Sequence, residues 1–306
     1  MSEFLTLLDK IYPLYLIVGM GYIAGRFLKT DRGTISSLVI YMIAPVVIFN
    51  GVATAPHNNS YLLLPVVFYF VGLTLSILFY YVGGFFWQTS ERNLLGFIAG
   101  TGNTGYFGLP LIIALFGKSG LSIAVFATLG LVLYESTRGY YIIARSHSTA
   151  KEAAIKVVKL PIIYAFIAGI VINRLNIHFG SSLTTAITYF TGAYTVFGMM
   201  IIGIGLATVT RATLDKSFTY ISFIAKFVGF PALMGLLVYL DSSILHLFNN
   251  EVHKIVMILA IAPMASNTVT YATHLKAHPE KAALTVAFST VFALVYIPLF
   301  ISIFLQ

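Results

Sequence analysis

The chain has 306 residues, of which 58% are hydrophobic and only 9% are charged, and its formal net charge is +8. Soluble domains carry about 25% charged residues, so this composition excludes a protein that covers its surface with polar groups in water. The basic residues stand in short segments between apolar runs, which argues against nucleic-acid binding. The chain has no cysteine, which excludes disulfides and thiolate metal sites.

Apolar runs of about 18–25 residues recur along the chain, the length that crosses a hydrocarbon core as a helix. The first run lacks a basic segment before it and a small-residue cleavage site after it, so we interpret it as a retained span rather than a signal peptide. We predict ten spans, at residues 11–28, 34–53, 61–86, 94–116, 121–143, 159–177, 184–208, 217–240, 252–275 and 281–304.

Span 4 contains four glycines, one asparagine and one proline between Gly100 and Pro110, a composition that makes a poor continuous helix. Unpaired backbone groups are costly in hydrocarbon, so such a break persists only where it lines a cavity or packs against protein. The alternative is that the glycines only allow neighbouring helices to approach closely.

Two further spans carry ionisable residues, which are costly in a membrane and indicate function by default. Glu135 in span 5 has Arg138 three residues later, and this spacing predicts an ion pair on one helix face. Lys226 lies near the middle of span 8. For all three residues a structural role and a role in ion coupling both remain open.

Span 9 repeats the pattern of span 4. Pro263 removes a backbone donor, and Ser266, Asn267 and Thr268 follow with side-chain partners. A broken helix places a half-helix N-terminus in the membrane, with roughly half a positive charge and free N–H groups. Two such ends that meet would attract a carboxylate, and Asn103 and Asn267 would hydrogen-bond it. The candidate substrate-binding residues are Gly102, Asn103, Thr104, Gly105, Pro263, Ser266, Asn267 and Thr268.

The two halves of the chain resemble each other. At an offset of 148 residues, five identities fall within spans 1–2 and 6–7, and at an offset of 164 Asn103-Thr104 matches Asn267-Thr268. We therefore predict a first repeat over residues 1–143, a basic cytoplasmic linker over 144–158 and a second repeat over 159–306. Because each repeat has five spans, the second is inverted, as in many secondary transporters.

Loop charge predicts the orientation. The loops on one side of the ten spans carry thirteen Lys and Arg, and those on the other side carry four. The positive-inside rule makes the richer side cytoplasmic. We expect a multi-pass inner-membrane protein with both termini on the outer, periplasmic side.

Three motifs resemble the auxin efflux carrier family. They are Gly102-Asn103-Thr104 with Gly108-Leu109-Pro110-Leu111 and Gly117, the segment from Lys226 to Met234, and Pro263 with Tyr271-Ala272 and His278-Pro279. The resemblance covers nearly the whole chain and implies the fold of the bile-acid sodium symporters, in which a scaffold domain supports a transport domain with crossing helices 4 and 9. It also implies carboxylate substrates, namely auxin in plants and malate- or malonate-like acids in bacteria, bound at the crossing.

This chain departs from the plant carriers in two ways that resemble the bacterial branch: Gly102 stands where they have proline, and their long cytoplasmic loop is missing. We therefore expect an all-α carrier for a small organic anion that works by alternating access, without cofactor or metal, with H⁺ or Na⁺ as candidate coupling ion. A sodium/proton antiporter is the alternative, although neither break contains a carboxylate. A membrane enzyme would need a clustered nucleophile, base or metal site, which the spans lack. The expected partners are the substrate anion and the lipid bilayer, and a homodimer is compatible with the sequence.

Overall fold

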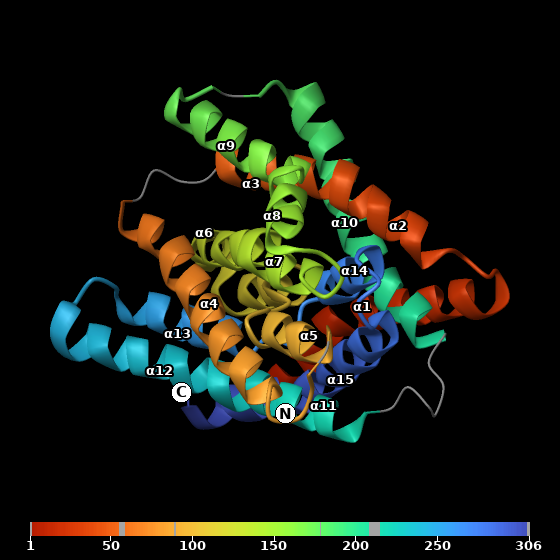
Figure 1. The fold of residues 1–306 in the computed structure, drawn as a ribbon. Coiled ribbons are helices and arrows are strands. Elements are labelled where there is room, and N and C mark those ends of the chain that lie inside the picture. The colour runs from red at the N-terminus through yellow and green to blue at the C-terminus, as the bar shows by residue number, and fades with distance from the viewer. Residues whose placement is uncertain (1, 55–58, 89, 178, 208–214, 305–306) are drawn as a thin grey trace.

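The computed structural model describes residues 2–54, 59–88, 90–177, 179–207 and 215–304. About 84% of the chain is helical, and the described residues contain no β-strand. The helices cross one another at varied angles rather than forming a parallel bundle (Figure 1). This architecture agrees with the helical membrane protein that the composition predicts.

The N-terminal half begins with a long helix and continues through several interrupted ones. Its α-helices are α1 (Ser2–Phe27), α2 (Arg32–Leu38), α3 (Ala44–Ala53), α4 (Leu63–Gly83), α5 (Ser90–Ala99), α6 (Leu109–Tyr134) and α7 (Tyr140–Ala144). A 3₁₀ turn, η2 (Asn59–Leu62), precedes α4. The wider π-helical turns η1 (Val39–Ile43), η3 (Thr104–Gly108) and η4 (Glu135–Gly139) join or precede neighbouring helices.

The C-terminal half has a similar mixture of long and interrupted helices. Its α-helices are α8 (Ala150–Val158), α9 (Pro161–Arg174), α10 (Ser181–Ala207), α11 (Lys216–Ile224), α12 (Phe230–Leu240), α13 (Asn250–Ala260), α14 (Asn267–His274) and α15 (Pro279–Phe304). Two π-helical turns, η6 (Ala225–Gly229) and η7 (Asp241–Leu245), follow α11 and α12. The segment predicted as a basic linker therefore holds a helix of its own, α8.

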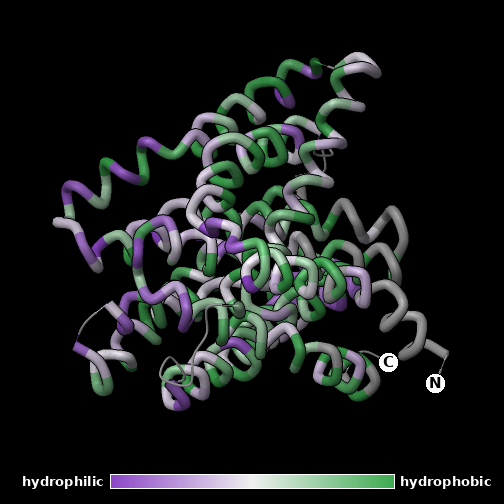
Figure 2. Tube along the Cα trace, turned by 90° about the vertical axis from the view of Figure 1, so that its right-hand side faces the viewer, coloured by the Kyte–Doolittle hydropathy of each residue, from purple (hydrophilic) through white to green (hydrophobic). Residues whose placement is uncertain are grey.

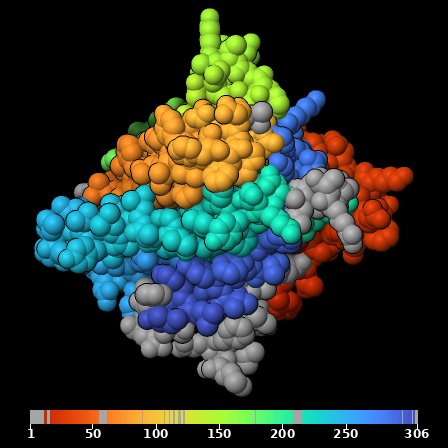
Figure 3. Space-filling view, turned by 60° about the horizontal axis from the view of Figure 1, so that its bottom comes forward, coloured from red at the N-terminus to blue at the C-terminus, as the bar shows by residue number. Residues whose placement is uncertain are grey.

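Among the described residues, four helical segments are long and apolar enough to cross a membrane: Arg32–Ala53, Leu63–Gly83, Ser181–Ala207 and Lys216–Leu245. Counting each bent pair as one span, 150–174 and 279–301 bring the number to six. Hydrophobic positions recur along most of the helices (Figure 2). The face built from α4, α11, α12 and α15 (Figure 3) exposes large apolar side chains such as Tyr220, Val228 and Tyr239, as a lipid-facing surface does.

Helix α6 contains the turn predicted between spans 4 and 5. A Cβ on Gly105, just before α6, would lie 3.9 Å from Thr128 Cγ2. In a straight helix, 23 residues would separate these positions by about 35 Å. The chain therefore doubles back within α6, and its second part runs beside the first.

Four predicted spans form one group of helices. Helix α1 packs along α10, and α3 packs along α9. Glycine allows the first approach, because a Cβ on Gly21 would lie 2.3 Å from Met200 O and one on Gly203 would lie 1.9 Å from Val18 O. The second group consists of α4–α7 and α11–α15, and it meets the first mainly where α10 contacts α15 and α14 contacts α2.

Candidate functional site

The break in the fourth predicted span is centred on Gly100 and Gly102. Helix α5 ends at Ala99, the π-helical turn η3 begins at Thr104, and α-helix resumes only at Leu109, where α6 begins. A Cβ on Gly100 would lie 2.4 Å from Gly72 O and from the Tyr134 ring, so only glycine permits this close passage. The Tyr134 hydroxyl donates to Gly96 O and Phe97 O, which satisfies two carbonyls at the end of α5.

The break in the ninth predicted span lies between α13 and α14. Helix α13 ends at Ala260, and α14 begins at Asn267. Pro263 lies in the intervening segment, where it interrupts no helical hydrogen bond. The side chain of Ser289 in α15 accepts a hydrogen bond of 3.1 Å from Met264 N, so a neighbouring helix holds part of this extended backbone.

The two breaks lie against each other, and we call this contact the crossing. Asn103 N donates to Pro263 O over 2.7 Å, a backbone hydrogen bond between segments 160 residues apart. The hydroxyls of Thr101 and Thr268 lie 3.5 Å apart beside it. Each interrupted backbone thus supplies a partner for the other, which meets the requirement for non-helical chain at membrane depth.

A cavity of about 120 Å³ lies next to the crossing. Six of the eight candidate residues line it, whereas Pro263 and Thr268 lie behind it in the crossing itself. Apart from Ala265, which lies between α13 and α14, the remaining lining residues come from α3, α6, η4 and α10, so both groups of helices contribute. The lining is Val47, Ile48, Gly102, Asn103, Thr104, Gly105, Leu109, Thr128, Leu131, Val132, Glu135, Thr191, Tyr194, Thr195, Ala265, Ser266 and Asn267.

Several polar atoms at this cavity have no protein partner. Asn103 is 2% exposed, and neither its Nδ2 nor its Oδ1 makes a hydrogen bond with the described residues. The hydroxyls of Ser266 and Thr128 are likewise buried without a partner. Burying polar groups in this way is costly. The cavity is therefore equipped to hydrogen-bond a polar molecule.

Glu135 reaches the crossing from η4 and is also 2% exposed. Asn267 Nδ2 donates to Glu135 Oε2 over 2.8 Å, and the Gly102 backbone contributes another hydrogen bond to the carboxyl group. The Tyr194 hydroxyl lies 3.2 Å from Asn267 Nδ2. Asn267 is thus fixed between α10 and η4, in contrast to Asn103.

The predicted ion pair between Glu135 and Arg138 is wrong. Among the described residues, no ion pair joins these side chains, and the Arg138 guanidinium instead stacks 5.9 Å from the Tyr141 ring centre. The prediction assumed an ordinary α-helix, in which residues i and i+3 share a face. Residues 135–139 form a π-helical turn with i→i+5 bonding, which changes that spacing.

Lys226 lies at the crossing on the side of α5. Its side chain is fully buried, and Nζ donates to Thr101 O over 3.0 Å and stands 3.9 Å from the centre of the Phe230 ring. A Cβ on Gly102 would lie 2.9 Å from this ammonium. The break in the fourth predicted span therefore has the Lys226 ammonium beside the backbone carbonyl of Thr101.

Three residues of α10 line the cavity but were not predicted from the sequence: Thr191, Tyr194 and Thr195. Their spacing of three and four residues puts them on one helix face. Polar residues on one face of an apolar span were the signal that could have found them.

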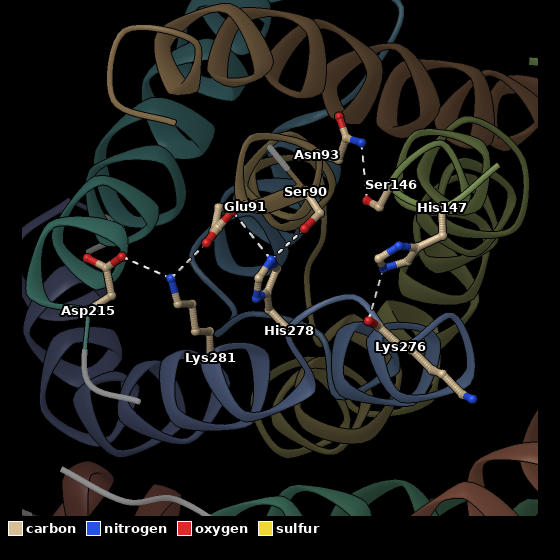
Figure 4. A network of polar contacts seen from close by, with 9 residues as sticks. All are labelled: Ser90, Glu91, Asn93, Ser146, His147, Asp215, Lys276, His278 and Lys281. Carbon is tan, nitrogen blue, oxygen red and sulfur yellow. Dashed lines mark hydrogen bonds and ion pairs between the residues drawn. The ribbon is translucent and has the colours of Figure 1, made fainter. Parts of the chain in front are cut away.

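A polar network connects the ends of helices in the second helix group, in the segments between predicted spans (Figure 4). Lys281 bridges Glu91 and Asp215 with contacts of 3.3 and 3.1 Å, and His278 lies 3.4 Å from Glu91. Burial raises the pKa of Asp215, but hydrogen bonds from Phe218 N and Lys281 outweigh it and hold the pKa below its usual range. Burial lowers the pKa of His278, which nearby Glu91 opposes only in part. The network fixes the ends of α5, α11 and α15.

The comparisons with known proteins agree with this membrane architecture. Residues 6–156 match the family model described as membrane transport protein. An uncharacterized transporter of Methanocaldococcus jannaschii is 28% identical over 213 residues, which covers 65% of this chain and 69% of the relative. An uncharacterized transporter of Methanothermobacter thermautotrophicus is 24% identical over 204 residues, which covers 65% and 67%.

These findings define the class first: the chain is a multi-pass membrane protein that is similar to transporters. More narrowly, residues 6–156 of the chain are similar to the membrane transport protein family.

Proposed function

We propose that this protein is a carrier that moves a small organic anion across the membrane. The substrate class is a mono- or dicarboxylate, malate-, malonate- or auxin-like, and the binding site is the cavity at the crossing. One observation carries the proposal: the Asn103 amide is buried at that cavity with both of its polar atoms unpaired. A carboxylate or hydroxyl-bearing acid would supply the missing partners.

The helix ends at the cavity favour an anion. Asn103 precedes η3 and Ser266 precedes α14, and neither side chain caps the helix that it precedes. The N-terminal end of a helix carries partial positive charge and unsatisfied N–H groups, which stabilise negative charge. Two uncapped ends therefore face the cavity from opposite segments.

The proposed architecture has ten spans arranged as two inverted repeats, residues 1–143 and 159–306, joined by the cytoplasmic linker 144–158. Both termini then lie on the outer side of the inner membrane. Because the cavity is lined by both helix groups, a movement of one group against the other would alter access to it. This boundary supports alternating access.

The test is uptake of radiolabelled malonate or acetate into proteoliposomes. Asn103→Ala removes the amide that would hydrogen-bond a charged ligand, and Asn267→Ala releases the Glu135 carboxyl group that lines the same cavity. Each variant should reduce uptake about 10- to 100-fold. Asn250→Ala, at the exposed start of α13, is the matched control and should retain uptake. Uptake at the wild-type level in both cavity variants would rule out this site.

A sodium/proton antiporter is the second candidate, and Glu135 is the observation in its favour. The sequence suggested that the crossing lacks a carboxylate, but η4 brings one to it. In proteoliposomes loaded with a pH dye, sodium added outside would enter through an antiporter in exchange for internal protons. The dye would then report a rise of the internal pH. A sodium pulse without any pH response, together with anion uptake, would exclude this candidate.

A further inference from the structure

Glu135 is the buried carboxyl group that the carrier proposal leaves without a task. It lines the same cavity as Asn103 and lies where the two broken segments and α10 converge. An ionised carboxylate beside a bound organic anion is a like-charge contact, which disfavours the ionised form of one of the two groups. The occupancy of the cavity and the protonation of Glu135 are therefore linked.

The charged and titratable groups around Glu135 are few. Lys226 approaches from η6, Tyr194 from α10 and Tyr271 from α14, while Tyr134 and Arg138 neighbour it along the chain. The Lys226 ammonium is directed to Thr101 O and makes no ion pair with Glu135 within 4.0 Å in the described residues. It supplies one positive charge to the crossing as a whole.

The charges of Lys226, Glu135 and the bound carboxylate give the number of protons that bind with the anion. With Lys226 and Glu135 both ionised, the crossing is neutral, and a carboxylate entering it would leave one uncompensated negative charge. Buried charge without compensation is strongly unfavourable. A proton on Glu135 restores neutrality, because the anion then balances Lys226.

Asn267 accommodates both states of Glu135. Its amide offers Nδ2 as a donor to the carboxylate, as the structure has it, and Oδ1 as an acceptor for the protonated acid. The Tyr194 hydroxyl beside it can likewise donate or accept. Protonation therefore requires no rearrangement of the backbone.

We propose that Glu135 is a proton-binding site, and that a monocarboxylate entering the cavity binds together with one proton on Glu135. This inference rests on the anion-carrier function proposed above. It names H⁺ as the coupling ion, because the Lys226 ammonium already stands beside the carbonyl of Thr101, where it would repel a sodium ion.

The test is isothermal titration of the purified protein with acetate and malonate in sodium-free potassium buffers. Each titration is repeated in two buffers of different ionisation enthalpy, which gives the number of protons taken up. The wild type should take up about one proton per bound acetate, and its affinity should fall about tenfold per pH unit on the alkaline side. Glu135→Gln should bind with no proton uptake and with affinity independent of pH.

Glu152→Gln is the matched control. Glu152 is an exposed carboxylate that completes the capping box of α8, a role that glutamine can retain. This variant should take up protons as the wild type does. In proteoliposomes, an acid-outside pH gradient should accelerate the protein-dependent part of acetate uptake, measured against protein-free liposomes, for the wild type and for this control but not for Glu135→Gln.

Three results would overturn the inference: proton uptake by Glu135→Gln equal to that of the wild type, anion binding by the wild type without proton uptake, or binding that requires sodium. The second result can be measured on the wild type alone, so the inference can be overturned even if Glu135→Gln fails to fold. They leave the carrier function standing. Absence of acetate and malonate binding by the folded wild type would instead remove the proposed function, and this inference with it.

Discussion

The two interrupted segments carry the same Asn-Thr pair, yet their asparagines have opposite surroundings. Asn103, after α5, is buried with its amide unpaired, and the nearby cation is Lys226. Asn267, at the start of α14, is held by the Glu135 carboxyl group and the Tyr194 hydroxyl. The Lys226 ammonium thus contacts only the span 4 break among these two asparagine-bearing segments, whereas the Glu135 carboxyl group is held by the Asn267 side chain of the span 9 break and by the Gly102 backbone of the span 4 break.

This difference teaches that a repeated motif need not have a repeated task. The backbone bond from Asn103 N to Pro263 O serves both segments alike, whereas the side chains around it differ. We infer that Asn103 is kept for the substrate and that Asn267 positions Glu135. The following variants test that division, from the largest expected effect to the smallest.

The largest effect is expected at the span 4 break from Gly100→Ala. Its new Cβ would meet Gly72 O and the Tyr134 ring at about 2.4 Å, and backbone atoms cannot yield cheaply. Overpacking of this kind costs about 3 kcal/mol. The midpoint of thermal unfolding in detergent should fall sharply. Gly105→Ala is the control within the same segment, since its Cβ would meet Thr128 at an ordinary 3.9 Å; equal stability of the two variants would contradict the packing argument.

The next variants compare the asparagines directly. Asn267→Ala removes a hydrogen bond to a carboxyl group and should lower the free energy of unfolding by about 2 kcal/mol. Asn103→Ala removes no protein hydrogen bond and should change it by less than about 0.5 kcal/mol. Denaturation curves of both variants, with Asn250→Ala as the neutral control, measure the contrast. A larger loss in Asn103→Ala than in Asn267→Ala would reverse the proposed division of tasks.

A smaller effect is expected from Tyr194→Phe. It removes a neutral hydroxyl that contacts Asn267, so the loss should be about 1 kcal/mol. Anion affinity should fall less than in Asn103→Ala. Tyr164→Phe, on the exposed surface of α9, controls for removal of a hydroxyl from the scaffold helices. If Tyr194→Phe costs as much as Asn267→Ala, the hydroxyl and not Glu135 is the main anchor of that amide.

The smallest effect concerns the network outside the crossing. The pKa of His278 is lowered in the folded state, so the unfolded state binds its proton more tightly. The stability linked to His278 is therefore complete above about pH 6.5 and declines as the pH falls through the folded-state pKa, by less than about 1 kcal/mol.

Thermal unfolding between pH 7.5 and 5 measures this decline, which His278→Asn should reduce. His246→Asn is the matched control, because both histidines have positive φ and asparagine tolerates that conformation. An identical pH profile in wild type and His278→Asn would show that the titrating group lies elsewhere.

Much of the crossing could be predicted from the sequence, because glycine and proline act on the backbone locally. Gly100, Gly102 and Pro263 cannot support regular membrane helices, and their breaks appear where they stand. The environment of Glu135 could not be predicted, because it depends on a π-helical turn and on helices distant in sequence. Thr191 and Tyr194 form a polar face of α10 that the sequence does contain, but that this face lines the cavity depends on which helices pack against it.

The joint between the two crossing segments is made of main-chain atoms. Asn103 N and Pro263 O are present whatever side chain stands at either position, with proline at 103 as the exception. Mutations that change the side chains of the cavity wall can therefore accumulate while this backbone hydrogen bond is retained. A change in what the cavity binds would therefore not require a change in how the two segments are joined.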